Sequence, residues 1–248
     1  MRKGMHMQRL IVPWLTAVAL LGTNGLAHAA GAHTTSAAEW TSASLRQALS
    51  ALPAADPRRG EQVHQRMFCA SCHGEAGVAP TQNWAHLAGQ KASYTAKMLL
   101  DYQQGRRLET QGAQLMRDVA QMLSPQQIAD VAAYYASLPP PRPEQAARAG
   151  KDTTTQVAEQ LVRRGDPQRL ITPCASCHGV AGQGGKLEAP ALAGQNPLYF
   201  VRTMLHYHGG QRNNDVAKGM RFFAERLSRS EIEALARYYA DLGVERRR

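Results

Sequence analysis

The sequence contains few aromatic side chains, only four cysteines and no strand-like alternation of apolar and polar residues. Aromatic residues make up 6% of its 248 positions, so a small domain would bury only a modest core from its own side chains. The lack of alternation argues against a β-sheet core. The one long apolar run, Leu10 to Leu21, is too short to span a bilayer comfortably, and no second run could do so.

The beginning of the chain has the three parts of a secretory signal peptide. Basic residues (Arg2, Lys3 and Arg9) precede the apolar run, and Ala27-His28-Ala29 is an A-x-A cleavage site. We therefore expect a signal peptide at 1–29 and export to the bacterial periplasm. An uncleaved membrane anchor stays open as the less favoured alternative.

Basic residues outnumber acidic ones by 29 to 19, which gives a formal net charge of +10. A positive surface can steer a protein towards acidic patches on partner proteins, and it leaves open a peripheral association with anionic membranes. Nucleic-acid binding is not expected, because the basic residues are not interleaved with aromatic ones and because exported proteins do not meet nucleic acid.

All four cysteines fall in a pentapeptide that occurs twice. Cys69-Ala70-Ser71-Cys72-His73 returns 105 positions later as Cys174-Ala175-Ser176-Cys177-His178. C-x-x-C-H is the attachment signature of c-type haem: two thiols add to the porphyrin vinyl groups, and the adjacent histidine reaches the iron. The repeat predicts two covalently bound haem c groups, with Cys69, Cys72, Cys174 and Cys177 as attachment residues and His73 and His178 as iron ligands.

Three other uses of paired cysteines are weaker alternatives. A zinc site does not need a histidine after both pairs. A thioredoxin-like redox motif should lie within a βαβ pattern, which the chain lacks. Structural disulfides are the third alternative, but haem attachment would consume all four thiols.

The repeat extends well beyond the cysteines. At the same offset Leu87-Ala88-Gly89-Gln90 matches Leu192-Ala193-Gly194-Gln195, and Arg58-Arg59-Gly60 matches Arg163-Arg164-Gly165. The chain is therefore predicted to hold a duplicated domain. The expected segments are a signal peptide at 1–29, an N-terminal extension at 30–57, domain one at 58–138, a proline-rich linker at 139–153 and domain two at 154–248.

Helices are predicted throughout, so the expected fold class is all-α, with one small helical domain around each haem. Capping boxes at Ser124–Gln127 and Ser228–Glu231 begin the last helix of each half. Earlier helices are expected at 58–70, 91–104, 155–165 and 196–208, and a short one at 44–49.

A second axial ligand should occupy matching positions in the two halves. Among the methionines only Met116 and Met220 match, each eight residues before its capping serine, in a loop that can fold over the haem. His64, His86, His206 and His208 have no histidine counterpart and are expected at the surface or at an interface, with His206 or His208 replacing a methionine as a minor alternative. A thioether ligand stabilises ferrous iron, and an iron with both axial positions filled has no open site for a substrate.

These features together resemble the cytochrome c4 family of dihaem periplasmic cytochromes. The resemblance runs from about residue 55 to the C-terminus, on the two C-x-x-C-H-G motifs, the Leu-Ala-Gly-Gln segments, the tyrosine-containing helices after them, the late methionines and the closing helices. It implies two class I cytochrome c domains packed about a pseudo-twofold axis, with axial pairs His73–Met116 and His178–Met220. It also implies that the chain is not an enzyme but carries electrons from a quinol-oxidising cytochrome complex (quinol–cytochrome c oxidoreductase) to a terminal oxidase.

One position departs from the family pattern. The family commonly has proline two residues before the Leu-Ala-Gly-Gln segment, where its carbonyl can accept the N–H of the haem-ligating histidine; Pro190 fits, but the first half has Ala85. Alanine still supplies a carbonyl, so the hydrogen bond can survive.

Other functions stay open at this point. The chain could be the cytochrome subunit of one periplasmic dehydrogenase. Less favoured is a dihaem enzyme such as a thiosulfate dehydrogenase or a peroxidase, or a gas sensor, because each needs an unusual or vacant distal position.

Overall fold

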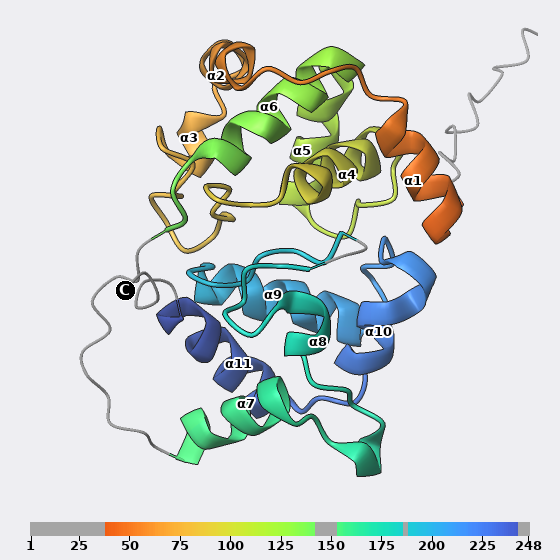
Figure 1. Ribbon diagram of the computed structural model, residues 1–248, viewed down its shortest axis with the longest axis vertical. Helices are drawn as coiled ribbons and strands as arrows, with labels where there is room; N and C mark the ends of the chain where they lie inside the picture. The colour runs from red at the N-terminus through yellow and green to blue at the C-terminus, as the bar shows by residue number, and fades with distance from the viewer. Residues whose placement is uncertain (1–37, 142–152, 186–187, 243–248) are drawn as a thin grey trace, which may run out of the picture. The chain divides into compact units, whose positions relative to one another are not determined.

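The computed structural model describes residues 38–141, 153–185 and 188–242, and these are helical with connecting loops (Figure 1). In these ranges the only extended pairing is an isolated antiparallel bridge between Asp166 and Ile171. The predicted all-α class is confirmed. The predicted signal peptide, residues 30–37 of the extension and residues 142–152 of the linker lie outside the described residues.

The first half packs its helices around one apolar core. Its helices are α2 (Pro57–Arg66), α3 (Ala70–His73), α4 (Ala92–Gln103), α5 (Gln111–Gln121) and α6 (Pro125–Ser137). Val63, Leu99, Ala120, Ile128, Val131 and Tyr135 are among the buried core residues. Helices α2 and α6 cross at Gly60, where a Cβ atom would lie 2.1 Å from the carbonyl oxygen of Asp130. Glycine therefore permits the close approach of these two helices.

The second half repeats this plan with its own core. Its elements are α7 (Thr153–Arg163), η1 (Pro167–Arg169), α8 (Ala175–His178), α9 (Pro197–His208), η2 (Val216–Lys218), α10 (Gly219–Ala224) and α11 (Arg229–Asp241). Leu161, Val162, Phe200, Tyr207, Ile232, Leu235 and Tyr239 are among the buried core residues.

The closing helices begin as the capping boxes predicted. Gln127 N–H donates to Ser124 Oγ, and Ser124 N–H donates back to Gln127 Oε1 at 2.8 Å. Ser228 and Glu231 make the same pair of bonds at the start of α11. Each box satisfies two backbone donors that a helix start leaves unpaired.

The matched Arg-Arg-Gly triplets lie at opposite ends of their helices, as the helices predicted at 58–70 and 155–165 placed them. Gly60 lies in the first turns of α2, whereas Gly165 follows the end of α7 with a left-handed φ of 70°. Its N–H donates to the carbonyls of Gln160 and Leu161 and so ends the helix. The three identical residues therefore lie at a helix start in the first half and at a helix end in the second.

The described part of the N-terminal extension contacts both halves. Its helix α1 (Ser42–Ser50) confirms the short helix predicted there, and Leu45 on it is buried. Trp40 is 5% exposed; its indole N–H donates to Asp101 of the first half, and its carbonyl accepts the N–H of Ala217 from the second half. Arg106 lies 3.8 Å above the Trp40 ring, a cation–π contact.

Candidate haem sites

The two cysteine pairs lie on matching single turns of helix. The leading cysteines, Cys69 and Cys174, are the N-cap residues of α3 and α8 and have almost the same backbone angles, with φ of −57° in both. All four thiols are free of disulfides. Burial raises the pKa of the Cys69 thiol and raises that of Cys174 to about 11. Cys69 and Cys174 are therefore neutral at physiological pH. None of the four thiols is in a disulfide, and attachment to a haem requires reduced thiols.

A glycine ends each of these turns. Gly74 has φ 74° and ψ 156°, a region that is essentially limited to glycine. A Cβ atom on Gly74 would lie 2.0 Å from the carbonyl oxygen of Val78. Gly179 has the same conformation after α8. This explains why glycine follows both C-x-x-C-H motifs.

His73 and His178 are held in the same way. Nδ1 of His73 lies 2.9 Å from the carbonyl oxygen of Ala85, and Nδ1 of His178 lies 3.0 Å from that of Pro190. The hydrogen bond predicted for Pro190 is present, and Ala85 supplies the same carbonyl in the first half.

This contact sets the tautomer of each ring. A carbonyl oxygen can only accept, so Nδ1 carries the proton and Nε2 presents a lone pair. Burial lowers the pKa of both histidines and so favours the neutral ring. Nε2 of His73 is buried and has no hydrogen-bond partner among the described residues. A buried nitrogen with an unused lone pair is what an iron ligand requires, so these residues fit a haem.

Met116 and Met220 lie on helices, not in the loops expected for them. Met116 is on α5 and Met220 on α10, and each packs, partly buried, against the core of its own half. Thr110 caps α5 by accepting the N–H of Ala113, a start signal that the sequence reading missed. Helix α10 has no side-chain cap.

The unmatched histidines are partly misplaced by the sequence reading. His64 is neither a surface nor an interface group: it is 3% exposed, with Nδ1 2.8 Å from the hydroxyl oxygen of Tyr135 in the first core. His86 accepts the N–H of Ala79, and Nδ1 of exposed His208 lies 2.9 Å from the carbonyl oxygen of Ala224.

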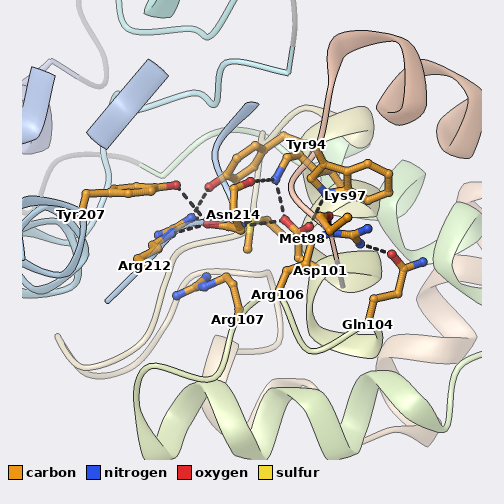
Figure 2. A network of polar contacts seen from close by, with 12 residues as sticks. Tyr94, Lys97, Met98, Asp101, Gln104, Arg106, Arg107, Tyr207, Arg212 and Asn214 are labelled. Atoms are coloured by element: carbon orange, nitrogen blue, oxygen red, sulfur yellow. Dashed lines mark hydrogen bonds and ion pairs between the residues drawn. The ribbon is translucent and has the colours of Figure 1, made fainter. Parts of the chain in front are cut away.

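Charged side chains form a buried cluster between the two halves (Figure 2). Lys97 pairs with Asp101 at 2.5 Å, and Arg107 pairs with Glu109 at 2.7 Å. Arg212 of the second half is 1% exposed and has no carboxylate partner within 38–141, 153–185 and 188–242; its Nε donates to the amide oxygen of Asn214 at 2.9 Å. Sequence reasoning missed this cluster, although Arg107 and Arg212 match at the repeat offset.

Among the described residues the cluster has one positive charge in excess: Lys97, Arg107 and Arg212 face the carboxylates of Asp101 and Glu109, and the neighbouring buried Asp215 is paired with Arg221. Nη1 of Arg212 is buried and has no hydrogen-bond partner in the part of the chain that the structure describes. Burial would raise the pKa of Tyr199, but the nearby Arg107 and Arg212 outweigh it and lower that pKa to about 8. A buried, unbalanced guanidinium requires an anion, and the carboxylates of a haem fit this need.

Comparison with known proteins identifies the family. The cytochrome c family model matches residues 57–139. Cytochrome c4 from Thiocapsa roseopersicina is 35% identical over 189 residues, which cover 75% of this chain and 93% of that protein. The chain belongs to the cytochrome c4 family. With its two C-x-x-C-H motifs, this family member is a dihaem c-type electron carrier with two covalent haem c groups.

Two further relatives extend the comparison. The crystal structure of reduced cytochrome c4 from Pseudomonas stutzeri has a TM-score of 0.65 and 29% identity, and the match covers 77% of this chain and all of that one. A thiosulfate dehydrogenase electron acceptor from Stutzerimonas stutzeri is 34% identical over 178 residues, 71% of this chain and 80% of that protein. Cytochrome c4 proteins and an enzyme's electron acceptor are thus both similar to this chain.

Among the described residues, no helix of this cytochrome c4 family member is long and apolar enough to cross a membrane.

Proposed function

We propose that this chain is a periplasmic electron relay between a quinol-oxidising cytochrome complex and a terminal oxidase, and not an enzyme. The observation that carries the proposal is the matched pair of histidines, each with Nδ1 bound to a carbonyl and Nε2 left as a ligand. Two haems held alike suit one-electron transfer at each, without chemistry on a bound substrate.

The residues of each half divide into three roles. Cys69 and Cys72 hold the first haem covalently, and Cys174 and Cys177 hold the second. His73 and His178 supply one axial ligand each, and Met116 and Met220 supply the other. Bound in this way, the haem iron accepts and donates single electrons.

Arg212 has a fourth role, in holding a haem carboxylate. Its buried Nη1 is the open donor in a cluster that lacks one negative charge. The repeat offers Arg107 for the same role in the first half, but Glu109 already neutralises that side chain.

The visible spectrum of the dithionite-reduced protein, recorded before and after addition of carbon monoxide, tests whether protein side chains fill both axial positions of each iron. The expected result is an unchanged low-spin c-type spectrum. A prompt shift in half or all of the haem signal would mean an open or labile distal site and would overturn the proposal that the protein is an electron relay. Fractionation of the producing cells, with haem staining of the periplasm, tests the location.

A second candidate partner has a specific observation in its favour. The similarity to thiosulfate dehydrogenase electron acceptors suggests a single dehydrogenase as the electron donor. Stopped-flow reduction of the oxidised protein by a purified thiosulfate dehydrogenase with thiosulfate, compared with reduction by the quinol-oxidising complex, separates the two donors. The faster donor at equal concentration identifies the physiological route.

A further inference from the structure

Two glutamines cross between the halves and end at the peptide groups that hold the haem-ligating histidines. Gln90 of the first half accepts the N–H of Ala191 at 2.8 Å through Oε1. That N–H and the carbonyl of Pro190 belong to one peptide group, and this carbonyl binds His178 Nδ1 at 3.0 Å. A continuous chain of hydrogen bonds thus runs from Gln90 to the histidine of the other half.

The reverse chain is also present. Gln195 of the second half accepts the N–H of His86 at 2.9 Å, and the carbonyl of Ala85 in the same peptide group binds His73 Nδ1 at 2.9 Å. Gln90 and Gln195 match in the repeat, as do His86 and Ala191. The two chains are therefore equivalent, and each runs from one half into the other.

Each glutamine is fixed by further contacts. Nε2 of Gln90 donates to the carbonyl of Ala191 at 3.0 Å, and Nε2 of Gln195 donates to that of His86 at 3.1 Å. The two side-chain oxygens also accept the N–H of Lys91 and of Asn196. Gln90 is 6% exposed and Gln195 is 9% exposed, so water does not readily replace these bonds.

We propose that Gln90 and Gln195 are positioning residues, each of which sets the ligand strength of the histidine in the opposite half through a single peptide group. The inference rests on the proposed histidine ligands. Hydrogen bonds in series polarise one another, so an acceptor on the peptide N–H makes the carbonyl of the same group a better acceptor. A stronger bond to Nδ1–H makes the imidazole a more basic ligand. A more basic ligand favours ferric iron and lowers the reduction potential of that haem.

Each hydrogen-bond chain runs from a glutamine into the opposite half. The proposal therefore makes a prediction that an ordinary packing role of the two glutamines does not. Replacing Gln90 with the similarly sized but apolar methionine (Gln90→Met) removes the first chain, and Gln195→Met removes the second. Gln90→Met should raise the potential of the second-half haem, and Gln195→Met that of the first-half haem.

A marker substitution identifies which haem has moved. Met116→His replaces the proposed thioether ligand of the first half by imidazole and lowers the potential of that haem, which separates it from the second in a spectroelectrochemical titration. In this background Gln90→Met is expected to raise the potential of the methionine-ligated haem, whereas Gln195→Met leaves it in place and raises the other. Gln121→Met, at an exposed position of α5, is the control and should move neither potential.

The outcomes separate the inference from the proposed function. If Met116→His moves neither potential, the ligand assignment has failed. If it marks one haem but each glutamine variant shifts the haem of its own half, or shifts both or neither, the crossed relay is overturned. Should Gln90→Met not mature, Gln90→Asn, whose amide is too short to reach Ala191, and Gln195→Met test the same relay with the same expected directions.

Discussion

Trp40 and Asp101 are joined by a hydrogen bond in which the indole N–H donates to a carboxylate that is 0% exposed. The same carboxylate also accepts hydrogen bonds from the ammonium group of Lys97 in the first half and from the side-chain amide of Asn214 in the second. A tryptophan of the N-terminal extension therefore completes a polar group shared by both halves. Since the family model begins at residue 57, this contact comes from a segment that precedes the matched cytochrome region.

Replacing Trp40 by phenylalanine should destabilise the protein. Trp40→Phe keeps a ring for Arg106 to cover but removes one donor from buried Asp101, a loss of about 1–3 kcal/mol in the free energy of unfolding. Urea unfolding of the haem-loaded protein measures it. Trp40→Ala, which also removes the ring, should lose more. Equal stability of Trp40→Phe and the unchanged protein would show that Asp101 does not depend on this donor.

Adding a methyl group at Gly74 should impair haem loading. Gly74→Ala forces alanine into a backbone conformation that costs about 1–3 kcal/mol, and its Cβ would meet the Val78 carbonyl at 2.0 Å. The turn that presents Cys72 and His73 would shift, so the yield of haem-loaded protein per chain should fall. Pyridine haemochrome analysis against total protein measures this yield.

Gly219 provides the matched control for that change. It has φ −59°, and nothing lies within 4 Å of its added Cβ. Gly219→Ala should therefore leave haem loading and stability nearly unchanged. A similar loss of haem in both variants would refute the conformational explanation for Gly74.

Stability should decrease in mild acid because of His64. Burial lowers the pKa of His64 in the folded protein below its ordinary value of 6.5. The unfolded chain therefore binds a proton at a higher pH than the folded one does. The contribution of neutral His64 to the free energy of unfolding is complete above about pH 6.5. It is lost as the pH falls through the lowered pKa of the folded protein, by about 1.4 kcal/mol for each pH unit between the unfolded and the folded pKa.

Denaturant unfolding at a series of pH values tests this. His64→Gln should flatten the decrease below pH 6.5, whereas Gln121→Met, a change of an exposed side chain on α5 that does not titrate, should leave the slope as it is. An unchanged slope in His64→Gln would assign the acid sensitivity to other groups.

Removing the unbalanced charge of Arg212 should make reduction harder. If its Nη1 holds a haem carboxylate, Arg212→Gln leaves that carboxylate without a cation in a buried site, and at least one reduction potential should fall. Glu109→Gln removes a buried negative charge and should act in the opposite direction. A redox titration followed by visible absorption measures both.

Arg58→Gln removes the same charge at an exposed position and is the control. Solvent screens that charge, so its effect on either potential should be much smaller. Arg212→Gln and Arg58→Gln with the same effect would show that Arg212 acts only through net charge and not on a haem carboxylate.

The sequence by itself was sufficient for the chemistry of attachment and for the helices with strong local signals. The C-x-x-C-H turns, the capping boxes at Ser124 and Ser228, and the helix after each Leu-Ala-Gly-Gln segment depend on residues a few positions apart. Interactions of this range are visible in the chain order. The carbonyls of Ala85 and Pro190 were also foreseeable, from the resemblance to a family with a fixed loop there.

Tertiary structure alone decided what depends on residues far apart in the chain. Gln90 contacts Ala191, and Asn214 contacts Asp101, across more than a hundred positions. These polar groups are buried only when the two halves meet, and burial is what makes their hydrogen bonds obligatory.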